Sequence, residues 1–156
     1  MRFFAWALLI AMSGEVLPPL LLAVDQGGRA QYIGGTVAEL PSKSEGNISV
    51  TDEEAFQFRA RRTSVRIPYN KITNVEYGQR VNRRYVSAVL ISPLLLLAKK
   101  RKHYLTVGYS DEQGRQQAMV FEVHKGAVRG LLVSLEARTG LSVEFQDEEA
   151  RKAGKG

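Results

Sequence analysis

The chain has 156 residues and a mass of 17.4 kDa, a size that fits one ordinary domain together with a targeting segment or a tail. With 44% apolar and 24% charged residues it is globular in composition, which excludes disordered and collagen-like chains. It has no cysteine and two histidines, which excludes disulfides, thiol nucleophiles and metal centres built on thiolates or several histidines. The formal net charge is +6, from 22 basic and 16 acidic residues.

The N-terminal segment has the pattern of a secretory signal peptide. Arg2 is followed by an unbroken apolar run over residues 3–12, and apolar character returns over residues 17–23. We therefore expect residues 1–23 to be a signal peptide, with a cleavage site that extends at most to residue 30. Three cleavage positions stay open: after Ser13, after Ala23 or after Ala30.

The alternative to a signal peptide is an uncleaved anchor in the inner membrane through residues 3–23. Glu15 and the Pro18-Pro19 pair lie in the middle of this segment, where they make a membrane-spanning helix costly. Both interpretations predict an exported domain, periplasmic or extracellular.

After this leader, seven short stretches alternate between apolar and polar residues in the way typical of β-strands. The Gly34-Gly35 pair predicts a bulge in the first of them, and Pro68 makes the outer edge of the fourth a poor position for ladder hydrogen bonds. Residues 110–114 predict a hairpin turn with Gly114 in a left-handed conformation. The seven expected strands cover residues 31–40, 47–51, 55–59, 63–69, 72–77, 103–109 and 116–123.

A single amphipathic helix is expected over residues 127–139, ended by Gly140. Its core-facing stripe has the spacing i, i+3, i+4 and i+7. This stripe consists of Val128, Leu131, Leu132 and Leu135.

The chain after the helix offers one more short strand over residues 141–145, followed by a polar, loose tail over residues 146–156. Residues 31–145 therefore form one domain. Because strands come first and the helix last, with no β-α-β spacing, the fold class expected is α+β and mainly β. We predict a strongly bent antiparallel sheet or partly open barrel of about seven strands, capped by one C-terminal helix.

Basic residues are concentrated in residues 59–102. This stretch holds twelve lysines and arginines and one acid, Glu76, for a net charge of +11, so the remainder of the chain carries −5. The asymmetry predicts a basic surface that attracts anions such as lipid headgroups, polyanionic sugars or acidic proteins. Because clustering in sequence need not persist in space, solvated strand faces are the alternative explanation.

An apolar insert over residues 86–98 interrupts the strand pattern, between Arg83-Arg84 and a basic run over residues 99–102. As a helix, the insert would be about 20 Å long, against about 30 Å for a bilayer core, so we do not expect it to cross a membrane. Three interpretations stay open. The insert is a buried strand with a packed loop, a loop that dips into a membrane beside anionic headgroups, or a surface for a partner protein.

The sequence contains no pattern for catalysis or for a cofactor: it lacks a G-x-S-x-G, a P-loop, a dinucleotide fingerprint and an EF-hand loop. His103 and His124 lie at predicted strand ends and are interpreted as solvated or hairpin residues, and the acids at 52–54 as a turn. We therefore expect no enzyme, no cofactor and no metal. Tyrosines interleave with the basic residues, but an exported chain is kept from cellular nucleic acid, so no nucleic-acid partner is expected.

The order of these features resembles a bacterial pleckstrin-homology-like or GRAM-like module of uncharacterised exported proteins. The similarity covers about residues 31–145, and its most telling piece is the step Ile67-Pro68-Tyr69-Asn70-Lys71-Ile72. The resemblance implies a seven-stranded, strongly bent sheet with a C-terminal helix, used to bind lipids or proteins. It implies no functional residues. The insert 86–98 and the strand after the helix depart from the family pattern.

The leading hypothesis is a non-enzymatic, exported binding module with a basic face that engages an anionic membrane surface or an acidic partner protein. The alternative is a protein-interaction or assembly module that docks through an edge strand or an apolar loop, with no lipid role. The residues predicted to bind the anionic surface are Arg83, Arg84, Lys99, Lys100, Arg101 and Lys102. The residues predicted for apolar docking are Leu94, Leu95, Leu96 and Leu97.

Overall fold

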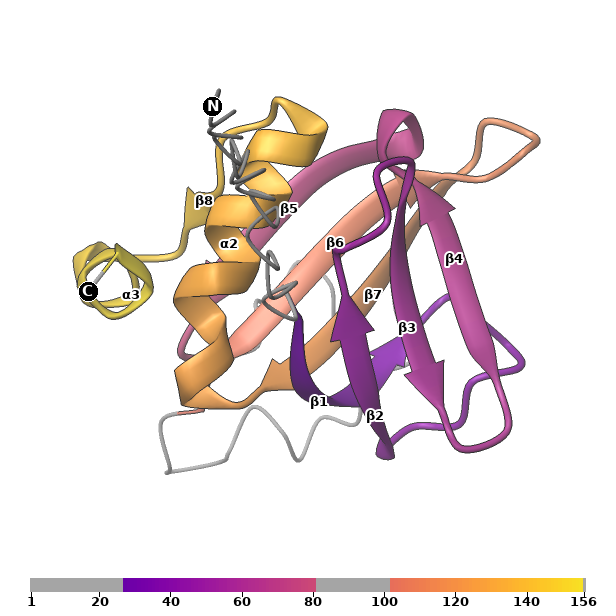
Figure 1. The fold of residues 1–156 in the computed structure, drawn as a ribbon, viewed down its shortest axis with the longest axis horizontal. Coiled ribbons are helices and arrows are strands. Elements are labelled where there is room, and N and C mark those ends of the chain that lie inside the picture. Colours follow the sequence, from indigo (N-terminus) through magenta and orange to yellow (C-terminus); the bar gives the residue numbers. More distant parts are fainter. Residues whose placement is uncertain (1–26, 81–101, 156) are drawn as a thin grey trace, which may run out of the picture.

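The computed structural model describes residues 27–80 and 102–155, which form one bent β-sheet with helices at its C-terminal end (Figure 1). The strands are β1 (Gly27–Gly35), β2 (Ser44–Ser49), β3 (Ala55–Ala60), β4 (Ser64–Pro68), β5 (Ile72–Gly78), β6 (Tyr104–Ser110), β7 (Gln116–Val123) and β8 (Glu144–Phe145). The helices are α2 (Lys125–Thr139), α3 (Glu148–Lys155) and the short 3-10 helix η1 (Tyr69–Lys71).

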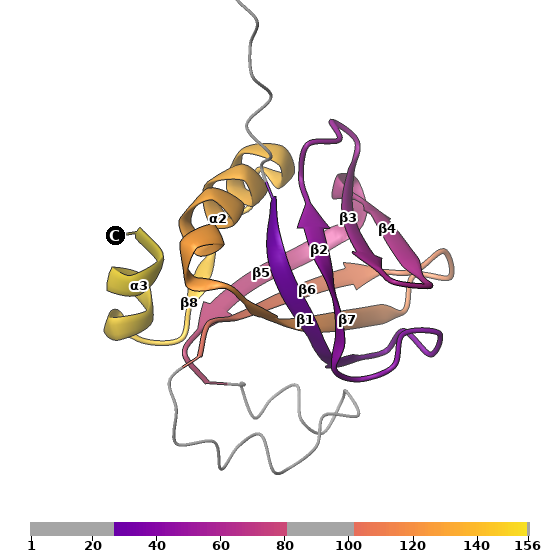
Figure 2. The same ribbon diagram turned by 60° about the horizontal axis from the view of Figure 1, so that its bottom comes forward.

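The strand order across the sheet is β4-β3-β2-β1-β7-β6-β5-β8, and within the described residues the outer strands β4 and β8 do not pair to close a barrel. The sheet bends strongly, and α2 lies beside β1 and β5 (Figure 2). The predicted fold class, a mainly β domain with a bent sheet capped by a helix, is confirmed. The short strand expected over residues 141–145 is present as β8, and the structure differs in its parallel pairing with β5 and in a second helix, α3.

The turn and bulge predictions are confirmed at three glycines. The β1–β7 register shifts between Tyr32 and Gly34, at the predicted bulge. Gly114 has a φ of 77° in the hairpin between β6 and β7, and Gly140 has a φ of 71° at the end of α2. Pro68 ends β4, which is an outer strand, as its missing N–H requires.

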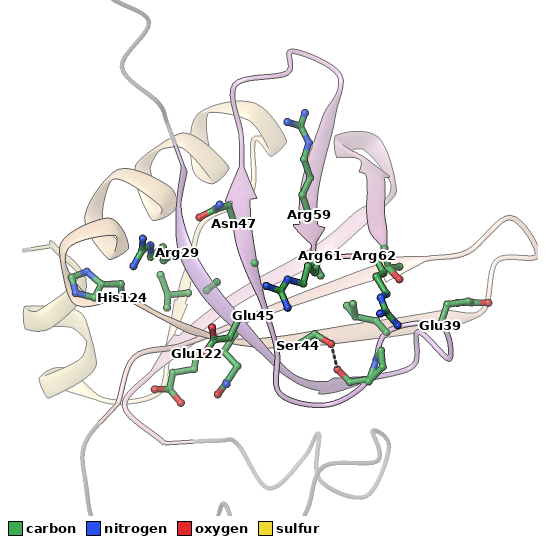
Figure 3. Close-up of a pocket in the computed structure, with 18 residues that line it drawn as sticks. Arg29, Glu39, Ser44, Glu45, Asn47, Arg59, Arg61, Arg62, Glu122 and His124 are labelled. Atoms are coloured by element: carbon green, nitrogen blue, oxygen red, sulfur yellow. Dashed lines mark hydrogen bonds between the residues drawn. The ribbon is translucent and has the colours of Figure 1, made fainter.

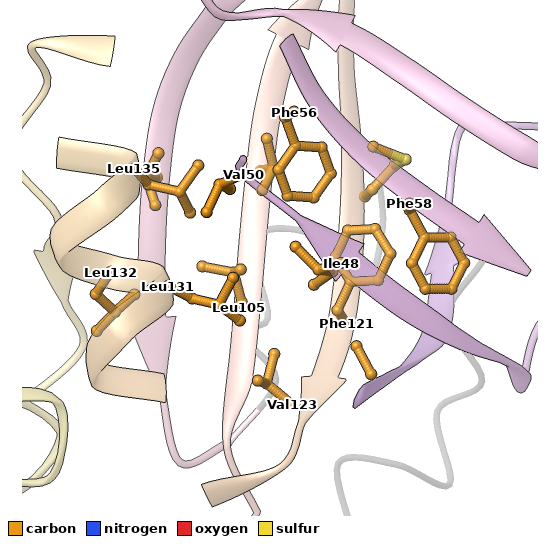
Figure 4. Packing of buried hydrophobic residues seen from close by; sticks show 14 of the residues in the cluster. Ile48, Val50, Phe56, Phe58, Leu105, Phe121, Val123, Leu131, Leu132 and Leu135 are labelled. Atoms are coloured by element: carbon orange, nitrogen blue, oxygen red, sulfur yellow. The ribbon is translucent and has the colours of Figure 1, made fainter. Parts of the chain in front are cut away.

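The core lies between the inner face of the sheet and α2, and Phe121 of β7 is at its centre (Figure 4). The Phe121 ring centroid lies 4.9 Å from that of Phe58, 5.9 Å from that of Phe56 and 5.8 Å from that of Tyr32. The predicted stripe of α2 closes the cluster, because all four of its residues are buried. The core is therefore formed by every second residue of the strands together with one face of α2, in agreement with the periods of two and 3.6 residues.

Both faces of β6 and β7 are buried. Leu105 and Val107 of β6 belong to the core, yet their neighbours Tyr104 and Thr106, which point to the opposite face, are also buried. The same holds for Ala118 and Val120 of β7. The polar outer face of the sheet therefore lies mainly on β1 to β4 and on the last residues of β7.

The C-terminal residues, expected as a loose polar tail, form helix α3 instead. Ala150 is 0% exposed, and Gly154 lies so close to Phe145, Leu132 and Tyr77 that a Cβ there would be 2.7 Å from the Phe145 ring. Two small residues at i and i+4 provide this contact, and acids in the first turn with lysines in the last favour the helix dipole. None of the helices in the two described ranges has the length and apolar character needed to cross a membrane.

The start of β1 packs tightly on the start of α2, which gives a first testable prediction. A Cβ on Gly28 would overlap the Cβ of Ala127, and neither group can rotate away. We expect Gly28→Ala to lower the free energy of unfolding by about 1–3 kcal/mol, as overpacking does. The measurement is urea denaturation.

The matched control is Gly130→Ala, on the solvent side of α2 with open space around it. This replacement should raise the free energy of unfolding by up to about 1 kcal/mol, through helix propensity. Equal and small effects of the two replacements would contradict the contact between β1 and α2.

Candidate functional site

Most residues predicted to bind an anionic surface or an apolar partner lie outside the described residues: Arg83, Arg84, Leu94, Leu95, Leu96, Leu97, Lys99, Lys100 and Arg101. Lys102 is described, and its Nζ lies 2.8 Å from Oε2 of Glu122 on β7. The hydrogen bond to this carboxylate raises the pKa of Lys102. The one described member of the predicted set is therefore held in an ion pair.

A groove of about 1420 Å³ opens on the polar outer face of the sheet (Figure 3). Its floor is formed by β1, β2, the end of β3 and the end of β7. The β3–β4 turn and residues 39–41 of the β1–β2 loop form its wall. The charged and amide side chains that dominate it are Arg29, Glu45, Asn47, Arg59, Arg61 and Arg62.

Strand register arranges one row of this groove. Asn47 of β2 lies directly opposite Arg29 of β1 on one side and Arg59 of β3 on the other. Directly opposed residues in a sheet point to the same face, and neighbouring strands are about 4.8 Å apart. The two arginines therefore flank the Asn47 amide at backbone positions about 10 Å apart. We call these three residues the arginine row.

A second row lies two residues further along the strands. Gln31 of β1 lies opposite Glu45 of β2 and Glu122 of β7. Continuing the β2–β3 register one residue past Ala60 brings Arg61 opposite Glu45. We call Glu45, Gln31 and Glu122 the acidic row; it lies about 7 Å from the arginine row along the strands.

Three of the four arginines that line the groove are available to a ligand. Within the part of the chain that the structure describes, the side chains of Arg29, Arg61 and Arg62 make no hydrogen bond and no ion pair. Arg59 donates to the Gln57 amide oxygen at 2.7 Å. Arg66, on β4 outside the groove, lies 3.3 Å from both Asp52 and Glu54.

The available carboxylate is Glu45. It is exposed, and among the described residues it makes no hydrogen bond or ion pair, although Arg61 is its neighbour across the strands. The Gln31 amide nitrogen donates to the Lys43 carbonyl oxygen at 3.4 Å, and the Gln31 amide oxygen accepts no hydrogen bond from the described residues. Cationic and anionic groups are thus both presented, in adjacent rows.

His103, interpreted from sequence as a solvated or hairpin residue, is half-buried and bonded. Its Nδ1 lies 2.5 Å from the Tyr77 hydroxyl. Burial lowers the pKa of His103, with the nearby charges of Lys125 and His124 as smaller causes. The tautomer of the His103 ring decides which of the two groups donates this hydrogen bond, and the pair ties the start of β6 to β5. His124 caps α2 by accepting the Gly126 N–H at 3.4 Å.

Within residues 27–80 and 102–155, no group of three or more histidine, aspartate and glutamate side chains is placed to hold a metal ion. The acids at 52–54 form the expected turn, in which Asp52 accepts the N–H groups of Glu54 and Ala55. What the described outer face offers is a polar groove with paired rows of charge.

Comparison with known proteins does not assign the chain to a family. No protein-family model matches the chain, and no curated protein matches it either. The functional argument therefore depends on the geometry of the groove.

Proposed function

We propose that this protein is a non-enzymatic, exported binding module whose basic groove engages anionic groups, either on a membrane surface or on an acidic partner. The observation that carries the proposal is that Arg29, Arg61 and Arg62 lie in one groove with their guanidinium groups uncommitted among the described residues. Such groups suit phosphate and carboxylate, because the planar guanidinium can bond both oxygens of an anion. The basic insert flanks, Arg83-Arg84 and residues 99–101, add to this attraction in the proposal.

Export is proposed with cleavage after Ser13 or Ala23. Cleavage after Ala30 would remove Gly27 to Ala30, which pair with β2, and would remove the Gly28 contact with Ala127. An anchor through residues 3–23 gives the alternative in which the domain stays at the membrane. N-terminal sequencing of the protein from its host, with separation of soluble and membrane fractions, distinguishes the two.

The pleckstrin-homology-like assignment is part of this proposal. It is supported by the order of seven antiparallel strands followed by a helix that packs on the core. The eighth strand, pairing in parallel with β5, and the helix α3 are additions to that pattern. Binding in the groove of the outer face, rather than at the insert, is the feature that the proposal adds to the resemblance.

The test is a triple replacement, Arg29→Gln, Arg61→Gln and Arg62→Gln. Each arginine near an anionic surface contributes about 1 kcal/mol, so affinity for anionic vesicles should fall by about 150-fold. Co-sedimentation of the protein with vesicles gives the affinity, and raising the salt concentration should release the wild-type chain. A soluble probe, polyglutamate, tests the acidic-partner version.

The matched control removes the same charge elsewhere, with Lys71→Gln, Arg129→Gln and Lys152→Gln, three exposed residues outside the groove. If this control weakens binding as much as the groove variant, net charge alone attracts the ligand and the groove proposal fails. If the wild-type chain ignores lipid charge, salt and polyglutamate, anion binding as a whole is wrong.

A second candidate function is protein interaction through an edge strand. The observation in its favour is that β4 is an outer strand of the sheet. It is short and ends in Pro68, and its Arg66 is held by Asp52 and Glu54, which are features that discourage edge pairing. A pull-down in which the triple groove variant keeps its partner would favour this function over anion binding.

A further inference from the structure

The groove contains a feature that anion binding does not need. A site built for anions alone would exclude carboxylates, yet Glu45 lies on the same strand as Asn47, two residues away and on the same face. Its carboxylate is exposed and uncommitted among the described residues. A purely anionic ligand on the arginine row would meet repulsion from Glu45, and its affinity would suffer.

On the β1 side, Glu45 and its neighbour offer acceptors to a cation that donates hydrogen bonds, while Arg61 lies across the strands on the other side of Glu45. Gln31 lies directly opposite Glu45, and its amide oxygen is left as an acceptor because its nitrogen bonds the Lys43 carbonyl. Beyond Gln31 on β7 lies Glu122, whose charge is balanced by Lys102. The open carboxylate is therefore Glu45, supported by one neutral acceptor.

We propose that the groove recognises a zwitterion in which a phosphate and a primary ammonium are joined by a short linker. The phosphate lies on the arginine row, against the Arg29 guanidinium and the Asn47 amide, and the ammonium lies between Glu45 and Gln31. The two rows are about 7 Å apart at the backbone. Their side chains are long enough to contact both ends of a ligand whose phosphate and ammonium are joined by a two-carbon linker. Phosphoethanolamine, free or as a lipid headgroup, has this chemistry. The inference rests on the proposed function, because Arg29, which both share, must first bind the phosphate.

The first arm of the test uses soluble probes on the full chain. Glycerophosphoethanolamine and glycerophosphoglycerol carry the same phosphodiester, and only the first carries an ammonium. We expect the wild-type chain to bind the ethanolamine probe about fivefold more tightly, the size of one exposed ion pair. Chemical-shift titration gives both dissociation constants.

The variant Glu45→Gln should abolish that preference and leave the ethanolamine probe's phosphate contacts intact. The matched control is Glu39→Gln, a second exposed acid at the groove, in the loop before β2 and away from Gln31. Thermal unfolding of both variants checks that neither disturbs the fold. A wild-type chain without preference, or an unchanged preference in Glu45→Gln, would overturn the zwitterion inference and leave anion binding standing.

The second arm distinguishes a lipid source from a soluble one. Vesicles of equal anionic charge are prepared with either phosphatidylethanolamine or phosphatidylcholine as the neutral lipid, since the trimethylated ammonium has no N–H to donate. Tighter binding to the ethanolamine vesicles, lost in Glu45→Gln, supports a headgroup as ligand. Preference for the soluble probe without preference among vesicles supports a free phosphoester. Failure of every probe and vesicle to bind contradicts both the inference and the proposed function.

Discussion

Replacing Phe121 with alanine is expected to lower the free energy of unfolding by about 3–5 kcal/mol. Phe121 is 0% exposed, and its ring contacts the rings of Tyr32, Phe56 and Phe58, which come from β1 and β3. The replacement removes a buried ring and leaves a cavity between strands that are distant in sequence. Since whole domains are stable by about 5–15 kcal/mol, this one change should consume a large part of the stability.

Urea denaturation followed by circular dichroism measures the effect. Phe121→Leu, which keeps most of the volume, should cost much less, and Val133→Ala should cost almost nothing, because Val133 is 59% exposed on α2. A loss below about 1 kcal/mol for Phe121→Ala would contradict a core centred on this ring.

Raising the pH from 10 to 12 should also destabilise the fold. Burial raises the pKa of Tyr32 from its ordinary 10.0 to about 12. Across this interval the unfolded chain releases the Tyr32 proton while the folded chain keeps it, so the free energy of unfolding falls as the pH rises. The contribution is complete below pH 10 and lost by pH 12, and two pKa units correspond to about 3 kcal/mol.

Stability against urea, measured at several pH values, gives the slope, and absorbance of the phenolate reports ionisation. Burial also raises the pKa of Tyr69, Tyr77, Tyr104 and Tyr109, so the wild-type slope reflects several groups. Tyr32→Phe should reduce the slope by about one proton. If that variant keeps the wild-type slope, Tyr32 ionises as readily in the folded chain as in the unfolded one, and its burial does not make the fold sensitive to high pH.

The hydrophobic pattern predicts the strands well because each strand has one buried face. In β3, Phe56 and Phe58 point to the core and alternate with Gln57 and Arg59, so the sequence itself carries the period of two. The helix α2 is predicted equally well, because its buried residues follow the helical spacing i, i+3, i+4 and i+7. The predicted first strand begins four residues too late, because Gly27 to Ala30 offer no apolar alternation, and their place depends on pairing with β2 and on contact with Ala127.

The features that the sequence pattern does not predict depend on contacts between distant residues. Helix α3 buries only Ala150 and Gly154, too small a signal to read as an apolar face. The short strand β8 pairs in parallel with β5, a partner almost seventy residues earlier. Such pairings are set by tertiary packing and leave little trace in local pattern.

The sequence predicts that the protein has a basic surface, but it does not predict where on the fold this surface lies. Arg59, Arg61 and Arg62 belong to the basic stretch over residues 59–102, but the sequence-based choice of binding residues fell on others, and Arg29 joins them only through the β1–β2 register. Glu45 lies between the predicted first and second strands, and in the structure it belongs to β2 beside these arginines. Lys102 is predicted to bind an anionic surface, but in the structure its ammonium forms an ion pair with Glu122 of β7.

The docking of α3 has a consequence for how the molecule is made. The residues that contact Tyr77 and Leu132 at this end of the domain follow the whole antiparallel sheet in chain order, and Gln146 reaches back to bond Glu76 at 3.1 Å. Until residues 146–155 pack onto the domain, that end of it stays uncovered. The domain is therefore complete only once this segment has folded. A chain truncated before Ala150 would expose the apolar surface around Tyr77 and Leu132 that α3 covers, and proteases could reach it.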